Sequence, residues 1–149
     1  MASERLVSGI TYYIITLTSG ANNRVLEVNG GGQTGNVDIW TNVQSTNEQW
    51  TAQIQSDGTW AFAYRRNPRA YLTTNGQNNQ VRAAEVDPSS TPAARWKAED
   101  LGDGYLFSNL QDCNYALDVS NNGTSDGTPV LLWSRHGAQN QRWRISRVA

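Results

Sequence analysis

A single cysteine and a single histidine stand among the 149 residues of this chain. One cysteine, Cys113, excludes an internal disulfide framework. One imidazole, at His136, together with one thiol cannot supply a zinc cage, so no metal site is expected. A chain without disulfides is typical of a reducing compartment, which favours the cytoplasm.

Long apolar runs and clusters of like charge are also absent. No stretch approaches the roughly 20 apolar residues that span a bilayer, so membrane insertion is not expected. The opening of the chain lacks the apolar core and cleavage site of a secretory signal, which again favours the cytoplasm. The 12 basic and 13 acidic side chains leave a net charge of −1 and form no basic stripe, so nucleic acid is not an expected partner.

The chain does contain a threefold repeat, marked by tryptophans. Trp50, Trp96 and Trp143 each close a similar tripeptide, and intervals of 46 and 47 residues separate them. Matching segments precede each one: Leu26-Glu27-Val28, Leu72-Thr73-Thr74 and Leu117-Asp118-Val119. Such a period indicates one supersecondary unit used three times. We place the repeats at about residues 10–55, 56–101 and 102–149 of a single domain, 1–149, because units of ~45 residues would be marginal alone.

Within each repeat the pattern is that of short strands. Apolar residues alternate with others around Tyr13 and again around Trp60. Turn-forming clusters such as Asn75-Gly76 and Asn121-Asn122-Gly123 interrupt these runs. No window of a dozen residues keeps a helical apolar period. The sequence therefore predicts an all-β fold of about twelve strands, four in each repeat.

Strand alternation separates core from surface. If Val37 and Ile39 point inward, Asp38 and Trp40 point outward. The same rule in the third repeat buries Val130 and Leu132 and turns Leu131 and Trp133 outward. The closing tryptophans occur in all three repeats, which favours a core role. Trp40 and Trp133 stand at equivalent outward positions, which favours a functional role.

Carboxylates and carboxamides accompany the two outward indoles. They are Asp118, Asn140 and Gln141 in the third repeat, and Glu27, Asp38, Asn47 and Glu48 in the first. Some of these polar side chains can also serve local turn capping. Together with an indole they favour a sugar site, since a pyranose lays its C–H face on an aromatic ring. Its hydroxyls bond to carboxylates and amides, and no cofactor is required.

These motifs resemble the ricin B-type lectin family. Three closures of the Gln-x-Trp type, a Leu-Asp-Val segment and an apolar-x-Trp before the closure carry the resemblance over about residues 10 to 148. It implies a β-trefoil, a six-stranded barrel closed by three hairpins with pseudo-threefold symmetry. It also implies a non-catalytic, multivalent protein that binds glycans and glycoproteins through galactose or N-acetylgalactosamine. The short chain most resembles cytoplasmic fungal lectins, which often pair, so a homodimer is an assembly to test.

Carried over by position, the resemblance predicts sugar sites in two repeats. In the third, Asp118 anchors two hydroxyls, Trp133 stacks, and Asn140 with Gln141 completes and supports the hydroxyl contacts. In the first, the matching residues are Glu27, Asp38, Trp40 and Asn47, with Glu27 one methylene longer than the usual aspartate. The second repeat has Thr73 for the acid, no aromatic near Ala84, and Ala93-Ala94 for the amides, so we interpret it as structural.

Three other functions stay open at this point. Cys113 and His136 provide a nucleophile and a base, although a strand-edge thiol and a loop histidine are more often inert. Glu27 and Asp38 are a carboxylate pair of the kind that glycosidases use, but a shallow outward site favours binding alone. A β-trefoil can also inhibit proteases through an exposed loop, and fold does not decide function. A module cut from a larger enzyme is disfavoured because the chain starts at Met1 without a linker.

Overall fold

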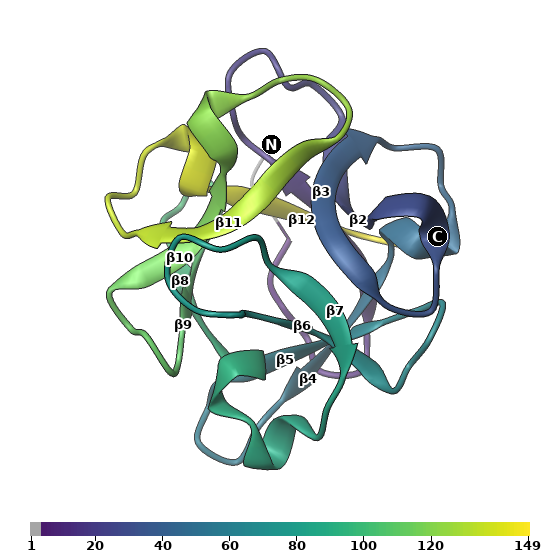
Figure 1. Cartoon of the computed structure of the whole chain (residues 1–149), viewed down its shortest axis with the longest axis vertical. Helices are drawn as coiled ribbons and strands as arrows, with labels where there is room; N and C mark the ends of the chain where they lie inside the picture. The colour runs from purple at the N-terminus through teal and green to yellow at the C-terminus, as the bar shows by residue number, and fades with distance from the viewer. Residues whose placement is uncertain (1–3) are drawn as a thin grey trace.

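The computed structural model describes residues 4–149, and in this part of the chain twelve strands form one closed antiparallel sheet (Figure 1). The predicted number of strands is therefore confirmed. The strands are β1 (Thr11–Thr16), β2 (Arg24–Val28), β3 (Gly35–Thr41), β4 (Trp50–Ile54), β5 (Trp60–Tyr64), β6 (Ala70–Thr73), β7 (Arg82–Glu85), β8 (Trp96–Asp100), β9 (Tyr105–Asn109), β10 (Tyr115–Val119), β11 (Thr128–Ser134) and β12 (Trp143–Arg147).

Six of these strands close a barrel. Each of β1, β4, β5, β8, β9 and β12 pairs with the next, and β12 pairs back to β1. The remaining strands form three hairpins, β2–β3, β6–β7 and β10–β11, one in each repeat. The hairpins meet around the axis, where β3 pairs with both β7 and β11 (Figure 1). This is the β-trefoil that the resemblance implied, and its three hairpins correspond to the three repeats of the sequence.

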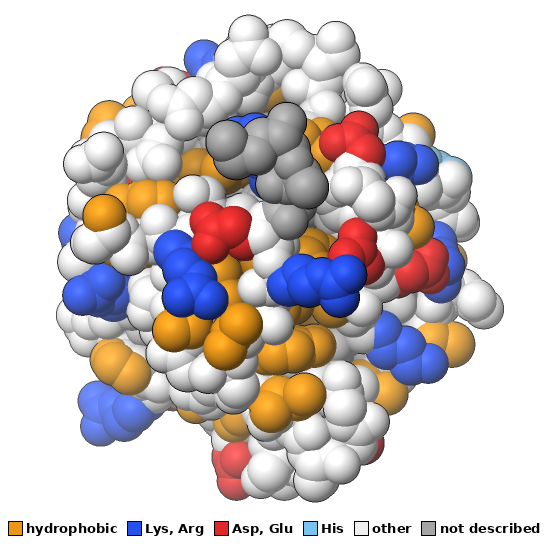
Figure 2. Space-filling view, turned by 180° about the vertical axis from the view of Figure 1, so that it is seen from behind, with side chains coloured by type: hydrophobic (Ala, Val, Ile, Leu, Met, Phe, Trp, Pro, Cys, Tyr) orange, Lys and Arg blue, Asp and Glu red, His pale blue; other side chains and the backbone are white. Residues whose placement is uncertain are grey.

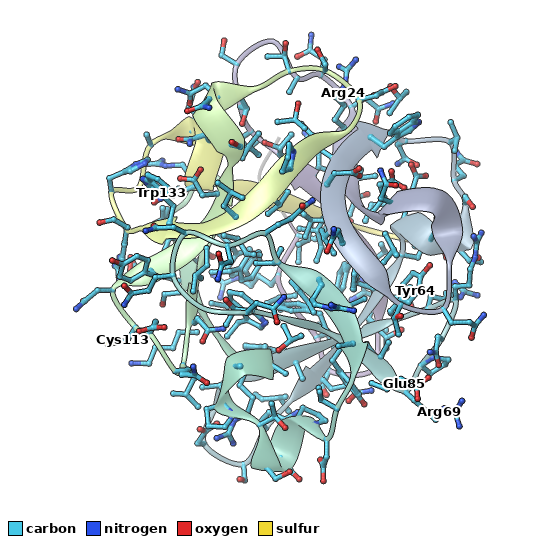
Figure 3. All side chains as sticks on the ribbon, viewed as in Figure 1. Arg24, Tyr64, Arg69, Glu85, Cys113 and Trp133 are labelled. Carbon is cyan, nitrogen blue, oxygen red and sulfur yellow. The ribbon has the colours of Figure 1, made fainter. Side chains whose placement is uncertain are left out.

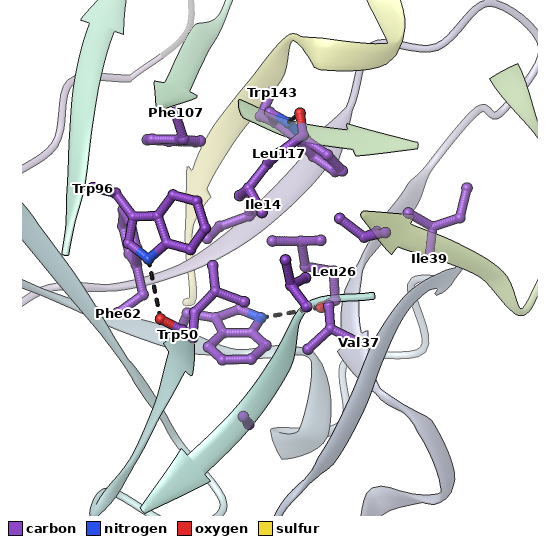
Figure 4. Packing of buried hydrophobic residues seen from close by; sticks show 14 of the residues in the cluster. Ile14, Leu26, Val37, Ile39, Trp50, Phe62, Trp96, Phe107, Leu117 and Trp143 are labelled. Carbon is purple, nitrogen blue, oxygen red and sulfur yellow. Dashed lines mark hydrogen bonds between the residues drawn. The ribbon is translucent and has the colours of Figure 1, made fainter. Parts of the chain in front are cut away.

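The closing tryptophans form the threefold element of the core (Figure 4). Trp50, Trp96 and Trp143 are fully buried, as predicted. A buried indole N–H requires an acceptor. Each one donates to the carbonyl of the leucine in its own hairpin, over 3.1, 3.0 and 3.3 Å; these leucines are Leu26, Leu72 and Leu117. The core therefore ties each hairpin to the barrel strand that follows it.

The alternation predicted for the hairpins is confirmed on the core side. Val37 and Ile39 of β3, and Val130 and Leu132 of β11, are fully buried. The intervening residues lie on the outer face of the hairpin, and Trp133 stands out from β11 (Figure 3). A 3-10 turn leads into each closing strand; the three turns are η2 (Thr46–Glu48), η4 (Pro92–Ala94) and η6 (Gln139–Gln141). The outer hairpin face and this turn bound the candidate site in each repeat.

The face of the molecule behind the view of Figure 1 carries side chains of several kinds. Basic, acidic and apolar side chains are interspersed on that face (Figure 2). Within residues 4–149, no helix is both long enough and apolar enough to cross a bilayer.

Candidate functional site

The third repeat has a cavity of about 340 Å³ on the outer face of its hairpin. Asp118 comes from β10, Trp133 from β11 and Asn140 from η6, so three of the four predicted residues meet here. Trp133 keeps 42% of its surface exposed, as a stacking ring requires. The lining consists of Asp118, Ser120, Asn121, Asn122, Leu131, Trp133, His136 and Asn140.

Asp118 provides the buried floor of this cavity. The residue is only 3% exposed, and its Oδ2 accepts a hydrogen bond of 2.8 Å from Gln141 Nε2. Burial raises its pKa above the usual value, while the bond from Gln141 and the charge of His136 oppose that rise. The carboxylate is therefore held in one orientation, with acceptor positions left for a ligand.

Gln141 does not line the cavity, which corrects part of the prediction. It is fully buried, and both ends of its amide are engaged. Nε2 donates to Asp118 and to the carbonyl of Ser134, and Oε1 accepts from the backbone N–H groups of His136 and Gly137. A carboxamide with these partners has no group left for a ligand. Gln141 therefore positions Asp118 and the loop after β11.

His136 and the turn at residues 120–122 also line the third cavity, although the sequence did not predict them as site residues. His136 Nε2 lies 3.6 Å from Asp118 Oδ2, and its Nδ1 accepts from the N–H of Ala138. Asn121 and Asn122 both have positive φ, which suits asparagine in a tight turn. The Asn-Asn-Gly cluster predicted the turn. Because the turn follows Asp118 by only one residue, its side chains also line the cavity.

The first repeat has a corresponding cavity of about 450 Å³. Trp40, 38% exposed, stands at the position of Trp133. Asn47 donates through Nδ2 to Glu27 Oε2 over 2.8 Å and to the carbonyl of Val28 over 3.1 Å. The lining consists of Glu27, Asn29, Gly30, Gly31, Trp40, Val43, Ser45, Asn47, Glu48 and Arg66.

Asp38 lies on the outer face of β3 but is covered, so its expected exposure is wrong. It is 1% exposed and does not line the cavity. Asn29 donates to its Oδ2 over 2.6 Å, and Glu27 lies directly opposite it in the strand register. The long Glu27 side chain and the turn at Asn29 cover the carboxylate. Alternation decides which face a residue is on, but not what packs over that face.

Glu27 and Asp38 share a proton. Burial, followed by the hydrogen bond and the charge of Asp38, raises the pKa of Glu27 to about 8. Burial also raises the pKa of Asp38. Asp38 Oδ1 is buried and has no other hydrogen-bond partner, which fits a protonated Glu27 as its donor. At neutral pH the pair therefore carries one negative charge.

Glu48 accepts hydrogen bonds from backbone N–H groups as Gln141 does in the third repeat, but it does not donate to the acid of the hairpin. It is 1% exposed and caps the turn, accepting from the N–H groups of Val43 (2.9 Å) and Ser45 (3.3 Å). A carboxylate has no N–H with which to hold the hairpin acid. Asn47 supplies that bond to Glu27 instead.

The second repeat lacks both the exposed tryptophan and the hairpin acid. The strand register places Ala84 at the position of Trp40, and Thr73 at the position of Glu27. Ala93 stands before the closing strand, where its carbonyl accepts from Asn109 and Thr74. A structural role for this repeat stays a prediction.

The sequence model of the ricin-type β-trefoil lectin domain matches residues 13–146, nearly the whole chain. The chain belongs to this family. It is thus a carbohydrate-binding lectin domain of the ricin B type. Its hairpin cavities and buried closing tryptophans are the structural elements that recur along the matched region.

Other known proteins resemble this lectin domain. It is 27% identical over 114 residues to the main hemagglutinin component type C of Clostridium botulinum C phage. That match covers 74% of this chain and 39% of the phage protein, so the chain spans less than half of that relative. Among solved structures, the designed threefold-symmetric protein ThreeFoil is 26% identical with a TM-score of 0.84, covering 93% of this chain and 99% of its own. The Macrolepiota procera ricin B-like lectin, solved with lactose, is 23% identical with a TM-score of 0.78, covering 97% and 100%.

The shared proton predicts how the stability of the lectin domain depends on pH. The pKa of Glu27 lies above its usual 4.5 in the folded state, so folding takes up a proton between pH 4.5 and about 8. The stabilisation from the pair is complete at low pH and is lost as pH rises through about 8. Glu27→Gln keeps an N–H donor for Asp38 and an acceptor for Asn47 at every pH. We expect its stability relative to the parent to rise by up to about 4 kcal/mol between pH 5 and pH 8.5, because the parent loses the stabilisation of the pair over this range.

Urea unfolding of both proteins at several pH values measures this difference. Glu85→Gln, at an exposed position of the second repeat, is a control that replaces the same type of side chain. Parallel pH profiles for the parent and Glu27→Gln would show that no proton is shared.

Proposed function

We propose that this domain binds galactose- or N-acetylgalactosamine-type glycans through its third and first repeats, without catalysis. One observation carries the proposal. Two hairpins related by the pseudo-threefold axis each combine an exposed indole with a buried, hydrogen-bonded acid at the same register positions. The β6–β7 hairpin of the second repeat, which has neither group, shows that the fold does not require them.

The third cavity matches the chemistry of a pyranose. The exposed face of Trp133 can stack on the C–H face of the sugar. Asp118 accepts from two adjacent hydroxyls through charge-assisted bonds, which are about twice as strong as neutral ones. Asn140 uses its Nδ2 on the carbonyl of Val119 and lines the cavity beside the acid. His136 and the asparagines of the turn supply further donors at the rim.

The carboxylates support binding rather than hydrolysis. A glycosidase places two carboxyl groups on opposite sides of the scissile bond, about 5–9.5 Å apart. Here Glu27 and Asp38 bond to each other, and Asp38 does not reach the cavity. In the third repeat, Asp118 is the one carboxylate among the described residues that line the cavity. Neither arrangement has an acid and a base flanking a ligand. No release of reducing sugar is expected.

Galactose-type ligands are proposed on two grounds. The Macrolepiota lectin of the same fold was solved with lactose, whose terminal sugar is galactose. The phage relative is named as a hemagglutinin component, and agglutination needs more than one binding site. Two sites on one rigid domain provide such multivalency. They suit densely glycosylated surfaces and glycoproteins better than free sugar.

Calorimetric titration with lactose tests the proposal. We expect two sites per chain with Kd on the order of 0.1–1 mM, because water competes for every hydroxyl bond. Trp40→Ala and Trp133→Ala should each leave one site with its affinity intact, and the double variant should bind none. Absence of lactose and N-acetylgalactosamine binding by the parent would contradict the proposal.

Red-cell agglutination measures the multivalent effect. Linking two sites raises avidity by about 10²–10⁴, so either single variant should agglutinate far more weakly than the parent. A single variant that agglutinates as well as the parent would assign the avidity to a homodimer or to the second repeat. Sedimentation of that variant would distinguish the two.

A further inference from the structure

An arginine from the second repeat reaches the cavity of the first. Arg66 follows β5 in the turn that leads to β6, yet it lines the same cavity as Trp40 and Glu27. Its side chain is exposed. The first cavity is therefore built from two repeats, and it has a cationic wall.

Arg66 is held in place by neutral groups alone. Its Nε donates to Thr46 Oγ1 over 2.9 Å, Nη1 to the carbonyl of Gly31 over 2.9 Å, and Nη2 to Ser45 Oγ over 2.8 Å. Gly31 has a φ of +67°, and a Cβ there would collide with the guanidinium. The absence of a Cβ at Gly31 leaves room for the guanidinium at this turn.

The guanidinium keeps both charge and donors available. No carboxylate among residues 4–149 forms an ion pair with Arg66. A guanidinium has five N–H groups, and three of these are used, which leaves two for a ligand. A planar, immobilised fork of this kind suits sulfate and carboxylate oxygens.

The acids of the first cavity are buried, and the Glu27–Asp38 pair keeps its one negative charge below the surface, whereas Arg66 is exposed. Glu27 holds the proton that it shares with Asp38, and its pKa is about 8. The carboxylate of Glu48 is buried and is occupied by backbone N–H groups of its own turn. Arg66 is therefore the exposed full charge on the wall of the first cavity.

The third cavity has no counterpart of Arg66. The position equivalent to Arg66 can be found from the backbone. The N–H of Arg65 donates to the carbonyl of Gln49, and the N–H of Leu17 donates to the carbonyl of Arg142, so Leu17 corresponds to Arg65. Thr18 consequently stands where Arg66 does, and it is buried against Thr16 at 2.8 Å. Neither lysine nor arginine is among the residues that line the third cavity.

We propose that the first site selects galactose-type glycans carrying an anionic group, a sulfate ester or a sugar carboxylate, and that Arg66 binds this group. The third site takes the neutral glycan. This inference rests on the proposed sugar binding and names the ligand class of one of its two sites. Bidentate hydrogen bonds from the guanidinium to the anion supply the preference. The first and third repeats then bind an anionic and a neutral glycan, respectively, on one glycosylated surface.

Titrations of single-site variants test the inference. Trp133→Ala leaves the first site, and Trp40→Ala leaves the third as an internal control. We expect Trp133→Ala to bind galactose 6-sulfate or 6′-sialyllactose about tenfold more tightly than galactose or lactose. The two anionic probes distinguish a sulfate from a carboxylate source. Trp40→Ala should show no such preference. Added salt should weaken the binding of the anionic sugars to Trp133→Ala, because it screens the charge of Arg66.

Arg66 variants in the Trp133→Ala background assign the preference to this side chain. Arg66→Gln should lose this preference, so that anionic and neutral sugars bind it with equal affinity. Arg66→Lys should retain a weaker preference, because it keeps the charge without the planar fork.

The outcomes distinguish the preference for anionic glycans from sugar binding itself. Equal affinity of Trp133→Ala for neutral and anionic sugars would overturn the inference and leave sugar binding intact. A preference that survives Arg66→Gln would also overturn it. Failure of Trp133→Ala to bind any of the four sugars would reject the first site as a sugar site altogether.

Discussion

Trp143→Ala is expected to lower the free energy of unfolding by about 3–5 kcal/mol, the usual cost of removing a large aromatic side chain from a core. Trp143 is fully buried and lies in the last strand of the barrel. Its truncation leaves a cavity between the barrel and the third hairpin. It also leaves the buried carbonyl of Leu117 without the indole N–H that it accepts now. Far-UV circular dichroism during urea unfolding measures this loss without relying on the fluorescence of the deleted indole.

Trp133→Ala is the matched control for this experiment. It deletes the same side chain from an exposed position in the same repeat, and we expect a change within about 0.5 kcal/mol. Comparable losses for the two variants would contradict the division into core and ligand-facing tryptophans. Trp50→Ala and Trp96→Ala should resemble Trp143→Ala, because their indoles make the same bond in their own repeats.

Asp118→Ala is expected to weaken sugar binding at the third site by about 10²–10⁴-fold. Each hydrogen bond to a charged group contributes about 1.5–3 kcal/mol, and the carboxylate is proposed to accept from two hydroxyls. Starting from a millimolar or submillimolar Kd, this loss leaves no measurable binding. The experiment is a calorimetric titration with lactose in a Trp40→Ala background, where the third site alone reports.

Two further variants separate contact from positioning. Asp118→Asn preserves shape and a partner for Gln141 but removes the charge, so it should lose nearly as much affinity as Asp118→Ala. Gln141→Ala leaves the carboxylate in place without its 2.8 Å bond, and we expect about a tenfold loss together with lower stability. Unchanged lactose affinity in Asp118→Ala would remove Asp118 from the site. A loss in Gln141→Ala as large as that in Asp118→Ala would mean that orientation matters as much as the acid itself.

Several features were predictable because they depend on local periodicity. The Trp50, Trp96 and Trp143 spacing predicted three equivalent units. Alternation along β3 and β11 predicted that Val37 and Val130 are buried and that Trp40 and Trp133 lie outside. These inferences hold because successive strand residues point to opposite faces whatever the rest of the chain does.

Other features depend on what lies over each face. Alternation placed Asp38 outside correctly, but Glu27 and the turn at Asn29 cover it, so it shares a proton instead of meeting a ligand. Gln141 stands beside Asn140 in sequence, yet one amide is consumed by the protein and the other lines the cavity. No sequence pattern distinguishes the two, because the difference lies in hydrogen-bond partners from β10 and from the loop after β11.

The sequence by itself determined the repeat, the strand faces and the two hairpins that carry an acid with an indole. The repeat follows from the intervals of 46 and 47 residues between the closing tryptophans, and the strand faces follow from alternation, which strand geometry translates directly into position. Only the tertiary structure decided which polar groups remain free for a ligand, that His136 lies beside Asp118, and that Arg66 of the second repeat completes the first cavity. Closure of the barrel brings Arg66 against Gly31, 35 residues away, and contacts at that separation depend on how the whole sheet curves.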